Sequence, residues 1–243
     1  MKLLAIDCSG LVASVAIVTE ETMLAEYTVN YKKTHSQTIL SMLDEIVKMV
    51  EMELSELDAI AVAAGPGSFT GLRIGSATAK GLGLALNKPI VAVPTLDGLA
   101  YNLYGTDKLI CPMMDARRNQ VYTGIYEFIG NELRIIKPQT ATQVEEILEE
   151  INRLGREVIF LGDGTAVYKE IIEEKTKVSY EFAPVHMNRQ RAGAIGALGL
   201  LLYKKNEIQT AAQHEPVYLR VSQAERERAE NIVSRKTREP LGI

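Results

Sequence analysis

The segment Gly65-Pro66-Gly67-Ser68-Phe69-Thr70-Gly71-Leu72-Arg73-Ile74-Gly75 decides how this chain folds. It follows an apolar run at 59–64, which has the composition of a buried β-strand, and it leads into a segment that predicts a helix. Gly65 and Gly67 permit backbone angles that other residues resist. Pro66 fixes the bend between the two glycines. The sequence therefore predicts a tight turn that carries the chain from a strand directly into a helix.

Polar side chains stand at the start of this predicted helix. Ser68 or Thr70 can cap its first turn through a hydroxyl oxygen. Arg73 places a positive charge in the first turn, where a cation opposes the helix dipole. We therefore expect Arg73 to have an anionic partner, either a carboxylate of this chain or a bound group. The other interpretation is a capped turn followed by a solvated arginine.

Two familiar phosphate-binding motifs do not fit the glycine segment. A P-loop requires G-x-x-x-x-G-K-[ST], and neither Lys-Ser nor Lys-Thr follows these glycines. The dinucleotide fingerprint G-x-G-x-x-G fails because its third glycine, Gly71, comes one residue late and because Pro66 lacks an amide donor. The segment itself therefore supports neither class of nucleotide-binding protein.

The composition describes a globular chain. With 243 residues, 47% of them hydrophobic and 24% charged, the chain can bury a substantial core in two lobes that share a cleft. Its net charge of -4 argues against RNA binding through the overall field of the protein. Cys8 and Cys111 lie in or beside apolar runs, as small core residues do in a reducing compartment. The amino-terminal apolar run is broken by Asp7 and does not resemble a secretory signal. We expect a soluble, cytoplasmic protein.

Hydrophobic periodicity and turn residues predict alternating strands and helices. The expected strands are near 2–7, 12–19, 23–31, 59–64, 90–93, 109–114, 120–128, 132–137 and 157–161, and the expected helices are near 36–52, 71–86, 142–154 and 190–204, with another helix from Thr95. The polar stretch at 105–108 is the expected boundary between two lobes. We therefore expect an N-terminal lobe at 1–105, a C-terminal lobe at 106–221 and a charged tail at 222–243.

Two of the predicted helices carry unusual faces. The helix at 36–52 is apolar over about half of its circumference, which is wider than one packing contact usually requires. The helix at 71–86 has small residues at a spacing of four, which allows another helix to approach closely. Either these faces pack within their own lobe or part of them awaits a partner protein. The candidate contact residues are Leu40, Leu43, Ile46, Val47, Val50, Gly71, Gly75, Ala79 and Gly83.

A weak internal repeat relates the two halves of the sequence. An apolar strand ends in Ile6-Asp7 and is followed by a second strand, and Met114-Asp115 shows the same order. This pattern resembles the actin-like ATPase fold, in which such aspartates face a central cleft. The alternative is two ordinary hairpins with polar turns. If the resemblance holds, the cleft residues are Asp7, Ser9 and Asp115.

The glycine segment and further motifs together resemble the bacterial TsaB (YeaZ) family. The other motifs are Asp7-Cys8-Ser9, His35-Ser36, Pro94-Thr95-Leu96-Asp97-Gly98-Leu99-Ala100, Met114-Asp115-Ala116-Arg117-Arg118 with Val121-Tyr122, and Pro216-Val217-Tyr218-Leu219-Arg220. They follow one another in order across most of the chain. The resemblance implies an α/β protein with the two-lobed actin-like ATPase (ASKHA) fold, which is built from duplicated ribonuclease-H-like lobes.

The resemblance also implies a function and partners. The family is the non-catalytic partner in the machinery that makes threonylcarbamoyladenosine at position 37 of tRNA. We expect the chain to pair through its N-terminal lobe with a TsaD-like catalytic subunit and to help recruit a TsaE-like ATPase. We expect contact with tRNA only through this complex and no contact with a membrane. A homodimer through the same surface is a further expectation, since an exposed apolar face favours association.

The sequence offers little support for an enzyme. His35, His186 and His214 are too scattered to form a known zinc motif, so we expect neither a metal site nor a cofactor. TsaD carries two metal-binding histidines four residues apart, and the resemblance aligns Thr95 and Leu99 with them. Neither side chain can replace a histidine ligand, so no catalytic residue is predicted.

A small-molecule kinase or ATPase of the actin-like fold is the alternative. In that case the turn Gly162-Asp163-Gly164 would join the cleft residues in facing a nucleotide. Asp97 and Asp115 are a further possible pair of carboxylates. Arg117 and Arg118 are either two solvated turn residues or a grip for a phosphate group.

Overall fold

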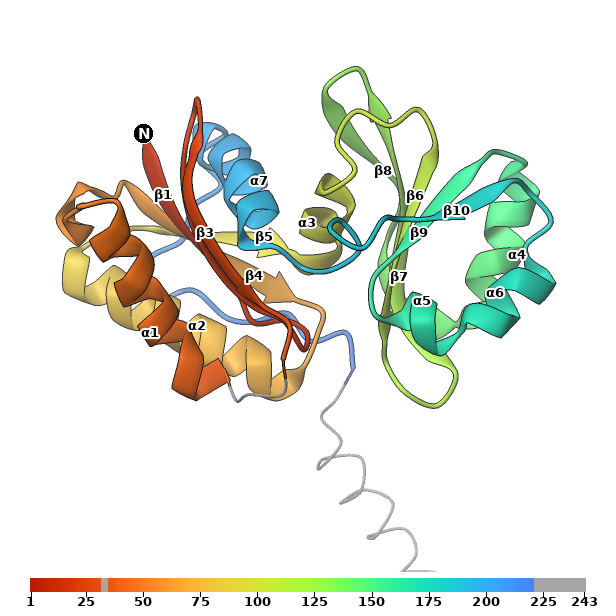
Figure 1. Ribbon diagram of the computed structural model, residues 1–243, viewed down its shortest axis with the longest axis horizontal. Coiled ribbons are helices and arrows are strands. Elements are labelled where there is room, and N and C mark those ends of the chain that lie inside the picture. The colour runs from red at the N-terminus through yellow and green to blue at the C-terminus, as the bar shows by residue number, and fades with distance from the viewer. Residues whose placement is uncertain (32–34, 221–243) are drawn as a thin grey trace, which may run out of the picture.

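The computed structural model describes residues 1–31 and 35–220 and contains two five-stranded sheets (Figure 1). The first sheet has the order β3-β2-β1-β4-β5. Its strands are β1 (Lys2–Asp7), β2 (Ala13–Thr19), β3 (Met23–Val29), β4 (Ala59–Gly65) and β5 (Ile90–Pro94). The second sheet has the order β10-β9-β6-β7-β8. Its strands are β6 (Leu109–Asp115), β7 (Gln120–Ile129), β8 (Glu132–Gln143), β9 (Val158–Leu161) and β10 (Tyr180–Phe182).

The two sheets share one topology. In the first, β1 pairs antiparallel with β2 and parallel with β4, while β3 and β5 form the edges. In the second, β6 pairs antiparallel with β7 and parallel with β9, while β8 and β10 form the edges. The order of the second sheet, read from β8, therefore repeats that of the first. This topology confirms the duplication that the sequence only hinted at around Asp7 and Asp115.

Helices cover both faces of each sheet because the central strands are apolar on both sides. On the first sheet, α1 (His35–Met49) and α2 (Phe69–Leu86) pack on one face, and α7 (Ala192–Lys204) packs on the other. On the second sheet, α4 (Val144–Leu154) and α6 (Lys169–Lys175) pack on one face, and α3 (Thr95–Tyr101) packs on the other. The remaining helices are the short α5 (Gly164–Val167) and a 3-10 turn, η1 (Leu54–Glu56).

Two helices lie between the sheets and join the lobes. α3 follows β5 of the first sheet, yet Leu96, Leu99 and Ala100 pack with residues of β6 and β7 in the second. α7 follows β10 of the second sheet, yet Ala192 and Ile195 pack on β1 and β2 of the first. Figure 1 shows both helices between the sheets. The expected lobe 106–221 thus includes a helix that packs on the first sheet, because the chain crosses back near its end. The tail at 222–243 lies outside the described residues.

Most of the expected elements are found with small shifts of their ends. The helix expected at 36–52 begins at His35 and ends at Met49, and the strand expected at 132–137 continues to Gln143. Pro138 does not interrupt β8, because β8 is an edge strand, where a proline is tolerated. The sequence prediction missed α5, α6 and β10. These elements have four, seven and three residues and are too short to show a clear period.

Helix α7 is fixed at its N-terminus by a side chain from the first sheet. Glu26 of β3 accepts a hydrogen bond from the Gly193 amide at 2.9 Å and forms an ion pair with Arg191. The Glu26 side chain is only 9% exposed. Ser14 Oγ also accepts a hydrogen bond from the Ala192 amide at 2.9 Å. Amides that lack partners in the first turn of the helix are thus satisfied by the sheet on which it packs.

We predict that Glu26→Ala lowers the free energy of unfolding by about 2 kcal/mol, because it leaves the half-buried Gly193 amide and a charged Arg191 without their partner. Urea denaturation monitored by circular dichroism measures this change. The matched control is Glu21→Ala, which removes an exposed carboxylate from the neighbouring β2–β3 hairpin and should change little. Equal effects of the two substitutions would contradict this role of Glu26.

Candidate functional site

The glycine segment places the start of α2 directly against the end of β1. A Cβ atom on Gly67 would lie 2.2 Å from the Ser9 carbonyl oxygen, and one on Gly71 would lie 2.0 Å from that of Cys8. The Ser68 amide donates to the Ser9 carbonyl at 2.7 Å. Only glycine permits this approach, because any side chain would overlap the backbone of β1. The expected turn is confirmed.

Ser68 is the N-cap of α2, and its hydroxyl oxygen accepts a hydrogen bond from the Gly71 amide at 3.3 Å. This resolves the choice between Ser68 and Thr70. Arg73 lies with its guanidinium carbon 3.9 Å from the centre of the Phe69 ring, and its Nε donates to the Tyr218 hydroxyl at 3.4 Å. The expected anionic partner is therefore replaced, among the described residues, by an aromatic one. A cation over a ring gains a comparable electrostatic attraction.

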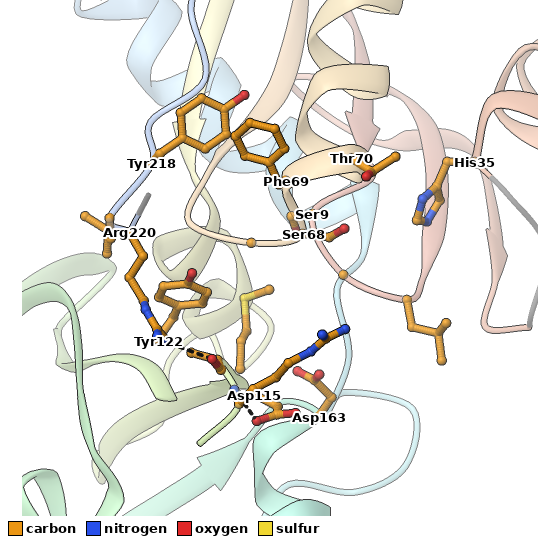
Figure 2. A pocket seen from close by; sticks show the side chains of 17 residues that line it. Ser9, His35, Ser68, Phe69, Thr70, Asp115, Tyr122, Asp163, Tyr218 and Arg220 are labelled. Atoms are coloured by element: carbon orange, nitrogen blue, oxygen red, sulfur yellow. Dashed lines mark hydrogen bonds between the residues drawn. The ribbon is translucent and has the colours of Figure 1, made fainter. Parts of the chain in front are cut away.

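A cleft of about 580 Å³ lies between the lobes. From the first lobe it is lined by Ser9, Gly10, His35 and the start of α2, and from the second by Asp115, Arg117, Tyr122 and Asp163. Tyr218, Leu219 and Arg220 from the end of the described chain also line it. Figure 2 shows Phe69 beside Tyr218 on one side and Asp115 beside Asp163 on the other. The volume falls within the range of small-molecule sites.

The end of the described chain joins the two lobes at this cleft. The Val217 amide donates to the Ala64 carbonyl at 2.7 Å, and the Tyr218 and Phe69 rings lie 4.8 Å apart. Arg220 Nη1 donates to the Ala116 carbonyl of the second lobe at 2.6 Å. Nothing in the sequence linked these distant residues, although the segment at 216–220 was among the motifs that carried the family resemblance.

Asp7 is buried and does not line the cleft. Its Oδ1 accepts hydrogen bonds from the Ser9 amide at 2.8 Å and the Ser9 hydroxyl at 2.6 Å. Burial raises the pKa of Asp7 to about 6, although the two hydrogen bonds from Ser9 oppose the shift. Of the three expected cleft residues, Ser9 and Asp115 line the cavity. Asp7 holds Ser9 in place through two hydrogen bonds.

Asp115 and Asp163 form the carboxylate pair of the cleft (Figure 2). Asp115 accepts hydrogen bonds from the Arg117 amide and the Tyr168 hydroxyl, both at 2.8 Å. The buried Oδ1 of Asp163 accepts none from the residues that the structure describes. Burial raises the pKa of Asp163, and the nearby charge of Asp115 adds to the shift. The turn at 162–164 thus reaches the cleft through Asp163, as the kinase alternative expected.

The other possible carboxylate pair is not brought together at the cleft, because Asp97 does not line it. Asp97 accepts a hydrogen bond from the Tyr126 hydroxyl at 2.8 Å, inside the second lobe. Burial raises the pKa of Asp97, and the hydrogen bond from Tyr126 opposes the rise. Within residues 1–31 and 35–220, no group of three His, Cys, Asp or Glu side chains is arranged to hold a metal ion.

The glycine ridge predicted as a contact surface faces the interior. Gly71, Gly75, Ala79 and Gly83 are buried against the first sheet and the segment beyond it, because α2 must lie close to β1 and β4. Leu43 and Ile46 are each 5% exposed and belong to the core, so they are not surface residues either. Val47 and Val50 are half-buried against the same core. Among the predicted contact residues, Leu40 is largely exposed, at 56%.

The outward face of α2 carries a second set of small residues. Ala77, Gly81 and Ala85 are exposed at a spacing of four, and Leu84 beside them is 69% exposed. A Cβ atom on Gly81 would meet no other atom within 4 Å. Helix α1 contacts α2 on the same face of the sheet and exposes Leu40 and Met49. The exposed faces of these two neighbouring helices are here named the α1–α2 surface. Across the described ranges, no helix is both long and apolar enough to cross a membrane.

Comparisons with known proteins relate the chain to proteins of threonylcarbamoyladenosine biosynthesis. The family model described as TsaD, tRNA N6-adenosine threonylcarbamoyltransferase, matches residues 22–228. The tRNA threonylcarbamoyladenosine biosynthesis protein TsaB of Bacillus subtilis is 36% identical over 225 residues, which cover 93% of this chain and 96% of that protein. TsaB of Escherichia coli is 31% identical over 72% of this chain and 76% of that protein.

Solved structures give the same result. YeaZ of Pseudomonas aeruginosa superposes with a TM-score of 0.78 at 28% identity, over 90% of this chain and 99% of that one. An inorganic polyphosphate/ATP-glucomannokinase of Arthrobacter superposes with a TM-score of 0.50 at 13% identity, over 84% of this chain and 99% of that one, which concerns the fold alone. The expected fold class, two actin-like lobes of α/β structure, is confirmed.

We predict that the buried Asp7 carboxyl makes stability depend on pH. Because its pKa is about 6 in the folded chain and its ordinary value is 3.8, the folded state holds the proton more tightly. Stability should therefore fall as pH rises from about 4 to about 7, by about 3 kcal/mol from this group. Asp7→Asn keeps an oxygen for Ser9 but cannot ionise. The unfolding free energy of the variant should therefore increase relative to that of the wild type as the pH rises over this range. A difference that is constant with pH would contradict the assignment.

Proposed function

The chain belongs to the TsaB (YeaZ) family, and from this premise we propose that it is a non-catalytic scaffold subunit required for threonylcarbamoyl transfer to adenosine 37 of tRNA. The relatives bear names that place them in threonylcarbamoyladenosine biosynthesis, and we extend that role to this chain. The matching family model is described as that of the transferase itself. The question is therefore whether this chain transfers the group or assists a subunit that does.

The observation that supports an assisting role concerns two positions in α3. The family resemblance aligns Thr95 and Leu99 with the metal-binding histidines of TsaD. Thr95 is fully buried and its hydroxyl oxygen accepts a hydrogen bond from the Gly65 amide at 3.1 Å. Leu99 is 1% exposed and packs in the core of the second lobe. Thr95 thus stabilises the glycine turn and Leu99 the core of the second lobe. Neither side chain offers a nitrogen or carboxylate ligand to a metal ion.

The α1–α2 surface is the proposed docking site for a TsaD-like catalytic subunit. Exposed small residues such as Ala77 and Gly81 allow a partner helix to approach the α2 backbone closely. Leu40 and Leu84 add apolar area that is exposed to water in the isolated chain. In the absence of the partner, the same surface would favour a homodimer. We further propose that the complex recruits a TsaE-like ATPase, meets tRNA as a complex and works in the cytoplasm.

A small-molecule kinase or ATPase of the actin-like fold is the second candidate, and the interlobe cleft favours it. The cleft has a suitable volume and carries two carboxylates, Asp115 and Asp163, which could hold a cation beside phosphates. Against this, Asp7 is occupied by Ser9 and does not reach the cavity. Turnover of ATP by the isolated chain would favour this second candidate.

We predict that Gly81→Arg abolishes binding to a TsaD-like subunit, whereas Gly81→Ala preserves it. Both substitutions replace a helical glycine by a good helix former, so each should raise helix stability by about 1 kcal/mol. They differ in size, and only arginine would hold a partner helix away from the α2 backbone. Isothermal titration calorimetry against the catalytic subunit measures the affinity. Equal affinities for two folded variants would show that the partner binds elsewhere.

A further inference from the structure

The turn between β6 and β7 holds an unusual backbone. Arg117, Arg118 and Asn119 have φ angles of 62°, 57° and 56°, so three successive residues lie in the left-handed region. This region is unfavourable for residues with a side chain, although asparagine tolerates it better than most. Glycine would adopt it without strain. The chain instead places two arginines there, and strain of this kind is typical of functional sites.

Hydrogen bonds on both sides hold the turn in this conformation. The Arg117 amide donates to Asp115 Oδ1 at 2.8 Å, and the Arg117 carbonyl accepts from the Gln120 amide at 3.2 Å. The Asn119 carbonyl accepts a hydrogen bond from the Val144 amide at 3.2 Å, at the start of α4. Arg220 fixes the other end through its bond to the Ala116 carbonyl. The backbone that carries the two arginines is therefore held on both sides.

Among the residues that the structure describes, cations outnumber carboxylates around this turn. Arg117, Arg118 and Lys169 are exposed and line a depression of about 650 Å³ on the second lobe. Asp115 and Glu170 line it as well, but Asp115 already accepts two hydrogen bonds. The guanidinium of Arg220 lies next to the turn. This local excess of positive charge stands out in a chain whose net charge is -4.

We propose that this turn, named here the arginine turn (116–119), binds the phosphodiester backbone of the tRNA that the complex modifies, an inference that rests on the proposed function. A guanidinium forms two parallel hydrogen bonds with a phosphate, which suits it to contacts that position a nucleic acid. Two successive arginines on one turn suit successive phosphates of one strand. The net negative charge of the chain disfavours RNA binding by the chain alone. The turn would therefore contact tRNA only within the assembled complex.

The test measures tRNA affinity of the complete complex over a range of salt concentrations, with wild-type chain and with the double variant Arg117→Ala, Arg118→Ala. Loss of two phosphate contacts should weaken binding and reduce the slope of log affinity against log salt by about two. The control is Arg153→Ala, an exposed arginine at the far end of α4, which should leave both quantities unchanged. Unchanged affinity and slope in the double variant would overturn the proposal.

A second variant separates binding from folding. Arg118→Gly removes the charge and also relieves the left-handed strain, so it should raise the Tm of the isolated chain while weakening tRNA binding. A lower Tm would show that Arg118 serves the fold, which would overturn the proposal. If the variants failed to join the complex while Arg153→Ala joined it, the turn would contact a protein subunit, and the proposal would be wrong. If the wild-type chain itself did not assemble with a TsaD-like subunit, the proposed function would fail first, and this inference with it.

Discussion

The close contact between the start of α2 and the end of β1 determines how the first lobe packs and where its cleft and outer surface lie. Gly67 and Gly71 lie against the Ser9 and Cys8 carbonyls at distances that exclude any side chain. This contact fixes the rotation of α2, so that one set of small residues packs inward and another faces water. It also brings Ser9 and Ser68 together as one wall of the interlobe cleft. The cleft and the α1–α2 surface thus have a common physical origin.

The sequence predicted this turn because glycine and proline restrict the backbone in known ways, but it could not orient the helix. Both faces of α2 carry small residues at a spacing of four, and periodicity alone does not tell which set is inside. The prediction chose Gly75 and Ala79, which are buried, while Ala77 and Gly81 are exposed. Contacts across the chain, such as that of Phe69 with Tyr218, have no local signal at all.

Under the proposed function, the chain keeps the architecture of an actin-like fold while the chemistry takes place on a partner subunit. The carboxylates that the internal repeat suggested are present, but Asp7 supports Ser9 and Asp115 supports the turn that follows it. Thr95 and Leu99 stabilise the core at the positions where the family resemblance places metal ligands in the transferase. Under the proposed function, what the chain contributes is surface: one face for a protein partner and one strained turn for RNA.

We propose that this chain assists threonylcarbamoyl transfer and does not perform it. It is tested most directly by measuring modified adenosine in tRNA after incubation with purified TsaD-like and TsaE-like subunits and the activated threonylcarbamoyl donor, with one subunit left out at a time. Product is expected only when this chain and the TsaD-like subunit are both present. Product formed by this chain without the TsaD-like subunit would contradict it.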